Sequence, residues 1–381
     1  MTEIHGTTHP RFAAVRDAFA ANFDAERSGG SDIGASFAAT LEGEPIVDLW
    51  AGHADEARTR PWEKDTIVNV YSTTKTMTAL TALLLADRGE LDFAQKVAHY
   101  WPEFAAAGKQ DVTVAHLMAH SAGLSGFHEK VSKSDLYDWE KVTTLLAAQV
   151  PFWTPGTAPG YHGITQGYLV GEVVRRITGQ SLGTVFRTEI AEPLGADFHI
   201  GLDASQDYRV ADLIPPPPGG GISDSATSEL AKNMSTNPAV NPLETRTREW
   251  RAAEIPAANG HGNARSVAQI QTLVANGGFA NGKQILSEAG VRRALEPQIK
   301  GDDLVLGMPI SYGLGYGLPG AALPLPNADS VYWGGYGGSL VIADMKTRLC
   351  LSYVMNKMAP TTVGDTRAGG IAVALWQALA A

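Results

Sequence analysis

The amino-acid sequence predicts a mixed α/β fold of the α+β kind, with an antiparallel sheet built from both chain ends, flanked by helices, and an inserted, mainly helical region. Three observations predict this arrangement. Segments rich in β-forming residues occur near both ends of the chain, at 36–50 and 339–355. The stretch from about 92 to 275 carries several helical patterns. Strand signals are scarce in that middle stretch.

The first elements are predicted to be a helix followed by a hairpin. Residues 11–24 carry apolar side chains at helical spacing. Two β-rich runs, 36–41 and 45–50, then flank residues 42–44, a spacing that is typical of a hairpin. We therefore expect the order helix, strand, strand.

A short strand at 67–71 is predicted to precede a buried helix. Residues 73–88 are rich in Ala, Leu and Met, and Gly89 supplies a stop signal. Ser72 is thus expected at the start of this helix. Further helices are predicted in the middle of the chain, at 113–120, 139–149, 163–179 and 267–276.

Strand patterns return at 339–344 and 349–355, before a closing helix at 369–379. The distribution predicts two domains. Residues 1–90 and 276–381 would form the α/β domain, and residues 91–275 the mainly helical insertion. The active site is expected in the cleft between them.

The composition is that of a compact globular protein, with 44% hydrophobic and 18% charged residues. A formal net charge of -10 disfavours a nucleic-acid partner and an anionic membrane surface, because both need a dense basic face. The richest apolar run, 79–86, is far shorter than the roughly 20 residues of a membrane-spanning helix. The N-terminus lacks a secretory signal pattern, so a cytoplasmic location is expected.

The sequence favours no metal site and no cofactor. The histidines show no metal-ligand spacing such as HExxH, and no P-loop or dinucleotide fingerprint occurs. The single cysteine, Cys350, excludes an internal disulfide and lies in a predicted buried strand. A catalytic role for this thiol is therefore not expected.

Ser72 and Lys75 form a candidate catalytic pair. On a helix, residues three apart share one face, so the amine can contact the hydroxyl. A serine hydroxyl needs a base to become a good nucleophile, and a lysine desolvated by an apolar helix can assist. The competing interpretation is a helix-capping serine beside a solvent-facing lysine.

Two further motifs follow downstream: Tyr161-His162-Gly163, and a glycine-rich block at 333–339 that leads into a strand. In this order the three motifs resemble those of the serine β-lactamase and penicillin-binding protein superfamily. The resemblance is greatest to the β-lactamase-like carboxylesterases called family VIII. It covers most of the chain, and the segments 116–124 and 171–179 support it.

The resemblance implies a β-lactamase-like fold in which Ser72 is the nucleophile and Lys75 holds or takes its proton. Tyr161 would act as general base and then as general acid. A phenol has a pKa near 10, so this role needs a nearby cation that stabilises the phenolate, and Lys75 is the candidate. The two groups would then titrate as a coupled pair.

The resemblance also places an oxyanion hole and a substrate-binding edge. The backbone N–H groups of Ser72 and Tyr336 would bind the oxyanion. Trp333, Gly334 and Gly335 would contact the substrate, and the glycines allow the strand edge to pass close to it. Their simplest alternative is a turn before a strand.

Two departures from the β-lactamase pattern favour neutral esters. Gly163 stands where β-lactamases usually have asparagine, and Trp333 stands where they have a cation for a substrate carboxylate. We therefore expect a serine carboxylesterase for small, short-chain esters that acts through an acyl-enzyme, with weak β-lactam hydrolysis as a side activity.

Three alternatives remain at this stage. A β-lactamase or D-alanyl peptidase is disfavoured by both departures and by the missing export signal. An acyltransferase of the same fold differs only in the acceptor of the acyl group. A non-catalytic binding protein is disfavoured because all three catalytic candidates are present.

The histidines are not expected to act in catalysis. A Ser/His/Asp enzyme built on His162 lacks a G-x-S-x-G motif, and His120 is expected to be structural.

Overall fold

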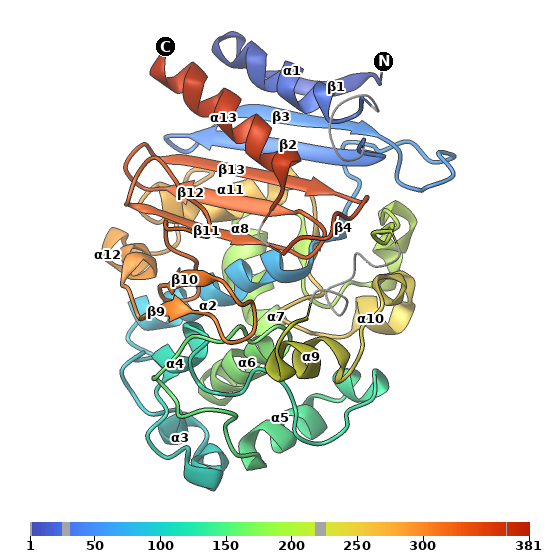
Figure 1. Ribbon diagram of the computed structural model, residues 1–381. Helices are drawn as coiled ribbons and strands as arrows, with labels where there is room; N and C mark the ends of the chain where they lie inside the picture. The colour runs from blue at the N-terminus through green and yellow to red at the C-terminus, as the bar shows by residue number, and fades with distance from the viewer. Residues whose placement is uncertain (1, 25–30, 218–225, 363) are drawn as a thin grey trace.

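A six-stranded antiparallel sheet forms the upper half of the protein as it is drawn in Figure 1, above a mainly helical half. The computed structural model describes residues 2–24, 31–217, 226–362 and 364–381. The strand order is β1-β3-β2-β13-β12-β11. The strands are β1 (Ile4–Thr8), β2 (Gly34–Leu41), β3 (Glu44–Gly52), β11 (Ser330–Gly334), β12 (Leu340–Asp344) and β13 (Leu349–Met355). The predicted sheet from both chain ends is confirmed.

The two ends of the chain meet where β13 pairs with β2, from Leu349 opposite Leu41 to Met355 opposite Ala35. All seven residues of β13 are buried, which explains why its sequence is apolar apart from Ser352. The β2-β3 hairpin forms as predicted. Its turn needs a left-handed backbone at Glu42 (φ 53°) and Gly43 (φ 90°), and glycine adopts such a conformation at no steric cost.

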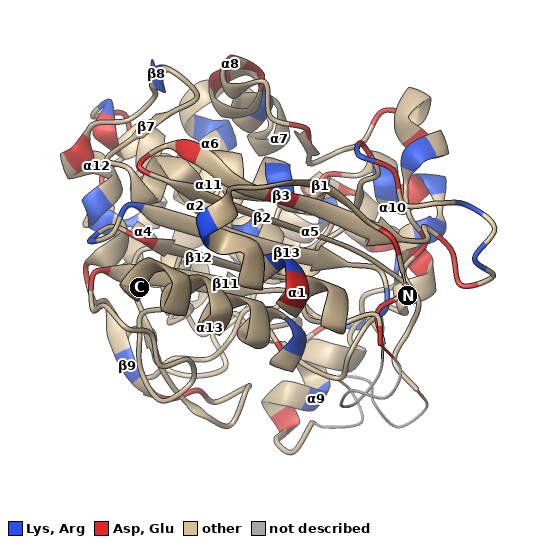
Figure 2. Ribbon diagram, turned by 90° about the horizontal axis from the view of Figure 1, so that it is seen from above, with Lys and Arg blue, Asp and Glu red and all other residues tan. Residues whose placement is uncertain are grey.

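Helices cover both faces of the sheet. The helices α1 (Ala13–Ala21) and α13 (Thr366–Ala380) pack against each other on one face. The opposite face is covered by α11 (Ala264–Ala275), which contacts β13 and β2. Figure 2 shows the sheet between these two layers. The predicted domain boundary at 275 assigned α11 to the insertion, whereas it packs on the sheet; the division into two domains remains a prediction.

The other helices include the long central helix α2 (Lys75–Asp87), which α6, α7 and α12 contact. None of the helices in the described ranges is both long and apolar enough to cross a membrane. The remaining helices are α3 (Val97–Tyr100), α4 (Val114–Met118), α5 (Trp139–Ala148), α6 (Thr165–Thr178), α7 (Leu182–Phe186), α8 (Glu192–Leu194), α9 (Glu229–Thr236), α10 (Arg248–Ala252) and α12 (Glu288–Arg292).

Short strands complete the fold. The strands β4 (Val68–Asn69), β6 (His261–Gly262) and β5 (Phe198–His199) form a small sheet in that order. Two hairpins are β7 (Phe279–Ala280) with β8 (Lys283–Gln284), and β9 (Ile299–Asp302) with β10 (Pro309–Tyr312). Of these short strands the sequence predicted only β4, within the segment 67–71, and it predicted neither β1 nor β11 of the large sheet. β1 is a mostly exposed edge strand and lacks apolar alternation.

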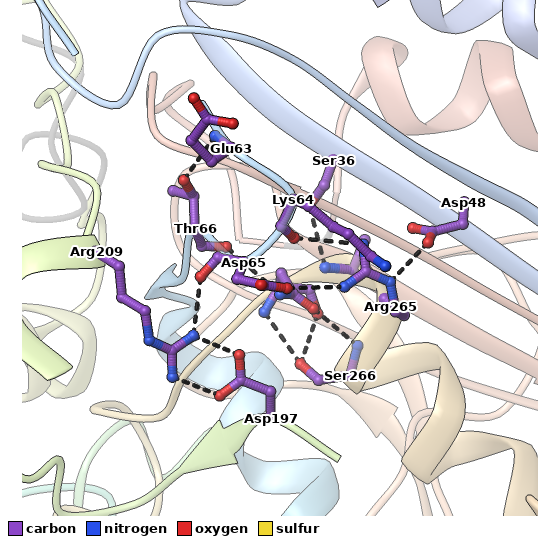
Figure 3. A network of polar contacts seen from close by, with 12 residues as sticks. Ser36, Asp48, Glu63, Lys64, Asp65, Thr66, Asp197, Arg209, Arg265 and Ser266 are labelled. Atoms are coloured by element: carbon purple, nitrogen blue, oxygen red, sulfur yellow. Dashed lines mark hydrogen bonds and ion pairs between the residues drawn. The ribbon is translucent and has the colours of Figure 1, made fainter. Parts of the chain in front are cut away.

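A polar network anchors the segment that leads into β4 (Figure 3). Arg265, at the start of α11, donates to Asp48 of β3 at 2.6 Å and to the carbonyl oxygen of Lys64 at 3.3 Å. Arg209 donates to the carbonyl oxygen of Asp65 at 2.8 Å and pairs with Asp197. The segment is therefore fixed to the sheet and to the helical half immediately before the chain reaches the candidate site.

Candidate active site

Ser72 lies in a tight turn between β4 and α2. The 3₁₀ turn Tyr71–Thr74 connects them, so the hydroxyl precedes the first turn of the buried helix. Tyr71 adopts a left-handed backbone with φ 45°. For a bulky side chain this conformation costs about 1–3 kcal/mol and persists only where surrounding contacts enforce it. One such contact is the Thr74 hydroxyl, which donates to the carbonyl oxygen of Tyr71 at 2.5 Å.

Contacts from distant parts of the chain hold the same turn. Ser339 donates to the carbonyl oxygen of Val70 at 3.0 Å and lies 2.9 Å from the Thr73 hydroxyl oxygen. Gly260 accepts from the Val70 N–H at 2.9 Å and donates its own N–H to Thr74 at 2.9 Å. The sequence did not identify Gly260, because this residue lies 186 positions after Thr74 and no local pattern marks a contact over such a separation.

Lys75 is completely buried, and its Nζ lies 3.1 Å from Ser72 Oγ. Two N–H groups donate to the carbonyl oxygens of Gly163 at 2.7 Å and Ala257 at 2.9 Å. Burial lowers the pKa of the Lys75 ammonium well below its usual range. In the neutral amine the two remaining hydrogens satisfy the two carbonyls, so the lone pair faces Ser72.

Tyr161 is the second side chain in contact with the Ser72 hydroxyl. Its phenol donates to Ser72 Oγ at 2.5 Å, and Lys75 Nζ lies 4.9 Å from the ring centroid. Burial raises the pKa of the Tyr161 phenol, although the hydrogen bond to Ser72 acts against this shift. Burial therefore favours the state in which both Lys75 and Tyr161 are neutral. The ammonium–phenolate pair expected from the sequence is disfavoured.

Asp303 fixes the backbone at Tyr161. Its Oδ1 accepts the N–H of Tyr161 at 3.0 Å and those of Val305 and Leu306 at 2.9 and 2.8 Å. Its Oδ2 accepts the hydroxyl of Tyr312 at 3.0 Å. The sequence did not single out this buried carboxylate, because it lies 142 residues from the tyrosine that it positions.

His162 and His120 support the site rather than act in it. His162 Nδ1 donates to the carbonyl oxygen of Gly160 at 2.6 Å, and its Nε2 accepts the N–H of Leu124 at 3.0 Å. His120 Nδ1 accepts the N–H of His162 at 3.0 Å. Burial lowers the pKa of His162 to about 3. With both ring nitrogens engaged by the backbone, this imidazole has no position left for a substrate proton.

Buried histidines predict a loss of stability in mild acid. Burial lowers the pKa of both His162 and His261 to about 3. The unfolded chain takes up these protons near pH 6.5 and the folded chain does not, so their contribution is complete above 6.5 and is lost as the pH falls. Between pH 7 and pH 5 each costs about 2 kcal/mol.

Asp32 acts in the opposite direction, because burial raises its pKa to about 6 and the folded state gains its proton first. It returns about 1 kcal/mol over the same interval. Burial also lowers the pKa of His120, which adds a further loss in the same direction. Urea unfolding should therefore give a free energy at least about 3 kcal/mol lower at pH 5 than at pH 7. Equal stabilities would contradict this prediction. Replacement of the exposed His99 with glutamine, which should leave the difference unchanged, is the control.

The two residues predicted for the oxyanion hole, Ser72 and Tyr336, line one cavity, whereas the predicted substrate residues Trp333, Gly334 and Gly335 are not part of its lining. A cavity of about 440 Å³ is lined by Ser72, Tyr161 and Tyr336 among others. A Cβ on Gly335 would lie 3.3 Å from the Ser72 nitrogen and only 2.2 Å from the carbonyl oxygen of Val70. Only glycine lets the end of β11 pass so close to the nucleophile turn.

Trp333 is buried and does not line this cavity. It stacks on His120 with ring centroids 5.3 Å apart and lines, with Gly334 and Tyr161, a narrow neighbouring slot of about 20 Å³. The structure thus brings Ser72, Lys75 and Tyr161 into direct contact and places Trp333 behind Tyr161. Within the described ranges, no cluster of three or more His, Cys, Asp or Glu side chains could hold a metal ion.

Comparisons with known proteins agree on one family. The family described as Beta-lactamase matches residues 19–375. An esterase/β-lactamase, LipL, of Mycobacterium tuberculosis is 35% identical over 97% of this chain and 87% of its own length. Esterase EstB of Burkholderia gladioli is 26% identical over 91% of this chain and 90% of its own length.

Solved structures give the same result. The crystal structure of a family VIII carboxylesterase superposes with a TM-score of 0.92 and 45% identity, over 99% of this chain and all of that one. A penicillin-binding protein homologue from Caulobacter crescentus gives 0.89 and 38% over 99% of this chain and all of its own. With the sequence match, the fold and the arrangement of the site in agreement, the chain belongs to the β-lactamase family.

Proposed function

We propose that this protein is a serine carboxylesterase that hydrolyses small, short-chain esters through an acyl-enzyme on Ser72. The observation that carries the proposal is the position of Ser72 Oγ, 3.1 Å from Lys75 Nζ and 2.5 Å from Tyr161 Oη, beside a cavity of about 440 Å³. The similarity to a family VIII carboxylesterase and to two proteins named as esterases supports it.

In the first half-reaction Ser72 Oγ attacks the ester carbonyl carbon while neutral Lys75 accepts its proton. The carbonyl π electrons move to oxygen, and backbone N–H groups at Ser72 and Tyr336 stabilise that charge. Collapse of the intermediate breaks the bond to the alkoxy oxygen. That oxygen leaves as an alcohol with the proton of Tyr161, which Lys75 then replaces.

The second half-reaction reverses these roles. A water molecule attacks the acyl carbon and gives its proton to the lysine–tyrosine pair. The acid is released when the bond to Ser72 Oγ breaks, and the pair returns one proton to that oxygen. The resting state is then restored, with one water consumed and one alcohol and one carboxylic acid formed.

The cavity favours an uncharged substrate. Among the described residues that line the cavity, one side chain is charged. It is Lys133, whose ammonium is paired with the carboxylate of Glu244 at 2.5 Å. No unpaired cation is thus offered to a substrate carboxylate by this described lining. The apolar members of the lining are Ile164, Met234, Pro238, Ala239, Val240, Pro242 and Ala258.

A substrate comparison tests the proposal. The p-nitrophenyl esters of acetate, butyrate and decanoate are measured beside a chromogenic cephalosporin, and Ser72 labelling by a fluorophosphonate is followed by mass spectrometry. We expect the short esters to have the highest kcat/KM, the cephalosporin to react slowly, and the label to appear on Ser72. A higher kcat/KM for the cephalosporin would replace the esterase by a β-lactamase. Label on another residue would overturn the mechanism.

A further inference from the structure

Part of the cavity lining is a flexible side chain, Met234 of α9. It lines the cavity together with Ser72 and Tyr161 and is only partly buried by the protein. Methionine is unbranched and fills irregular gaps in apolar surroundings. A side chain in this position occupies volume that a substrate group could otherwise take.

Gly163 provides the space in which Met234 lies. A Cβ on Gly163 would lie 2.5 Å from Met234 Sδ and 3.1 Å from its Cγ, both shorter than a normal contact. The next nearest atom, Tyr161 Cε1, would be 3.7 Å away, an ordinary contact. The conflict is therefore specific to Met234. The asparagine usual at this position in β-lactamases would therefore require this methionine side chain to move.

The position of Met234 is fixed by the neighbouring residues of α9 and the loop that follows. Asn233 and Asn237 both donate to the carbonyl oxygen of Phe127 at 2.9 Å, and Asn237 also accepts the N–H of Val131 at 2.9 Å. A Cβ on Gly126 would lie 2.1 Å from Asn233 Oδ1. The helix is thus docked closely on the 126–131 loop. These contacts hold the backbone that carries Met234 beside the cavity.

We propose that Met234 sets the size of the ester group that enters the cavity, and that position 163 is glycine to leave this side chain its space. The inference rests on the proposed esterase function and names the residue that limits its substrates. The limited group is an unbranched apolar chain, in either the acyl or the alkoxy half of the ester.

The test measures chain-length profiles of Met234 variants in two series, p-nitrophenyl esters from acetate to octanoate and acetate esters of ethanol to octanol. Met234→Ala is expected to raise kcat/KM for the longest member relative to the shortest about tenfold in one series. The series that responds identifies the half of the ester that enters. Met234→Phe should shift the same profile toward the shortest member, whereas Met234→Leu conserves volume and should leave it within about twofold.

Gly163→Ala supplies an independent arm. The added methyl group displaces Met234 into the cavity, so we expect lower activity on the longest ester. In the Met234→Ala background the same change should have a smaller effect, because the conflicting atoms are gone. Lys232→Ala, an exposed change on the same helix, is the control that should alter neither profile.

The outcomes separate this inference from the proposed function. If Met234→Ala and Met234→Phe both hydrolyse acetate esters normally and keep the wild-type profile in both series, Met234 does not limit the substrate and the inference fails while the esterase stands. If the wild-type protein hydrolyses no ester at all, the proposed function itself fails. Equal effects of Gly163→Ala with and without Met234 would also contradict the inference.

Discussion

Replacement of Ser72 with alanine is expected to lower kcat/KM for p-nitrophenyl acetate by at least about a thousandfold, because the acyl-enzyme cannot form. Lys75 and Tyr161 would remain, but both act on protons of Ser72 Oγ, which is the atom that they share. Steady-state hydrolysis and the phosphonate labelling described above measure the effect. Labelling should disappear together with turnover.

The control for this variant is Ser205→Ala, which removes an exposed hydroxyl outside the cavity lining and should leave kcat/KM unchanged. The thermal unfolding midpoint of Ser72→Ala should stay close to that of the wild type, since the Tyr71–Thr74 turn is held by other residues. Ester turnover that survives in a folded Ser72→Ala protein would show that the nucleophile is elsewhere.

Lys75→Arg and Lys75→Met are both expected to lower kcat by about a thousandfold. The structure favours a neutral amine whose lone pair faces Ser72, and neither replacement supplies a proton acceptor. Arginine stays protonated in proteins, so it keeps a charge and donors for the carbonyl oxygens of Gly163 and Ala257. If Lys75 acted only as a cation, Lys75→Arg would retain much of the activity, and that result would contradict its role as a base.

The pH dependence of the wild-type enzyme gives a second readout of Lys75. Burial lowers the pKa of its ammonium, so kcat/KM should rise with pH as this group loses its proton and then reach a plateau. Because burial raises the pKa of Tyr161, no decline is expected on the alkaline side below about pH 10. Circular dichroism of each Lys75 variant checks that the fold is retained, since Lys75→Met leaves two buried carbonyl oxygens without donors.

Local sequence patterns predicted those elements in which buried residues recur at a regular spacing along the chain. The hairpin β2-β3, the strands β12 and β13, and the central helix α2 all have the apolar spacing that their surroundings require. β1 escaped prediction because a mostly exposed edge strand needs no such spacing. The helix α11 was predicted correctly, but its pattern could not reveal that it packs on the sheet rather than with its sequence neighbours.

The candidate site divides in the same way. Ser72 and Lys75 are one helical turn apart, so local geometry was enough to pair them, and the family resemblance supplied Tyr161. Residues that act through the backbone carry no such signal. Asp303 holds the tyrosine by accepting its N–H, and Ala257 uses only a carbonyl oxygen that any residue would provide. The role of Met234 follows from its close approach to Gly163, a contact that no sequence pattern indicates.

The pairing of β2 with β13 also sets an order of events during synthesis. β2 emerges from the ribosome long before β13, and chains grow at about 5–20 residues per second. For tens of seconds the central edge of β2 has no partner, and an unpaired strand edge is prone to associate with other chains. The carbonyl oxygen of Val70 likewise lacks its hydrogen-bond donor until Ser339 has been synthesised. A nascent chain therefore acquires its complete nucleophile turn only after nearly all of it has been made.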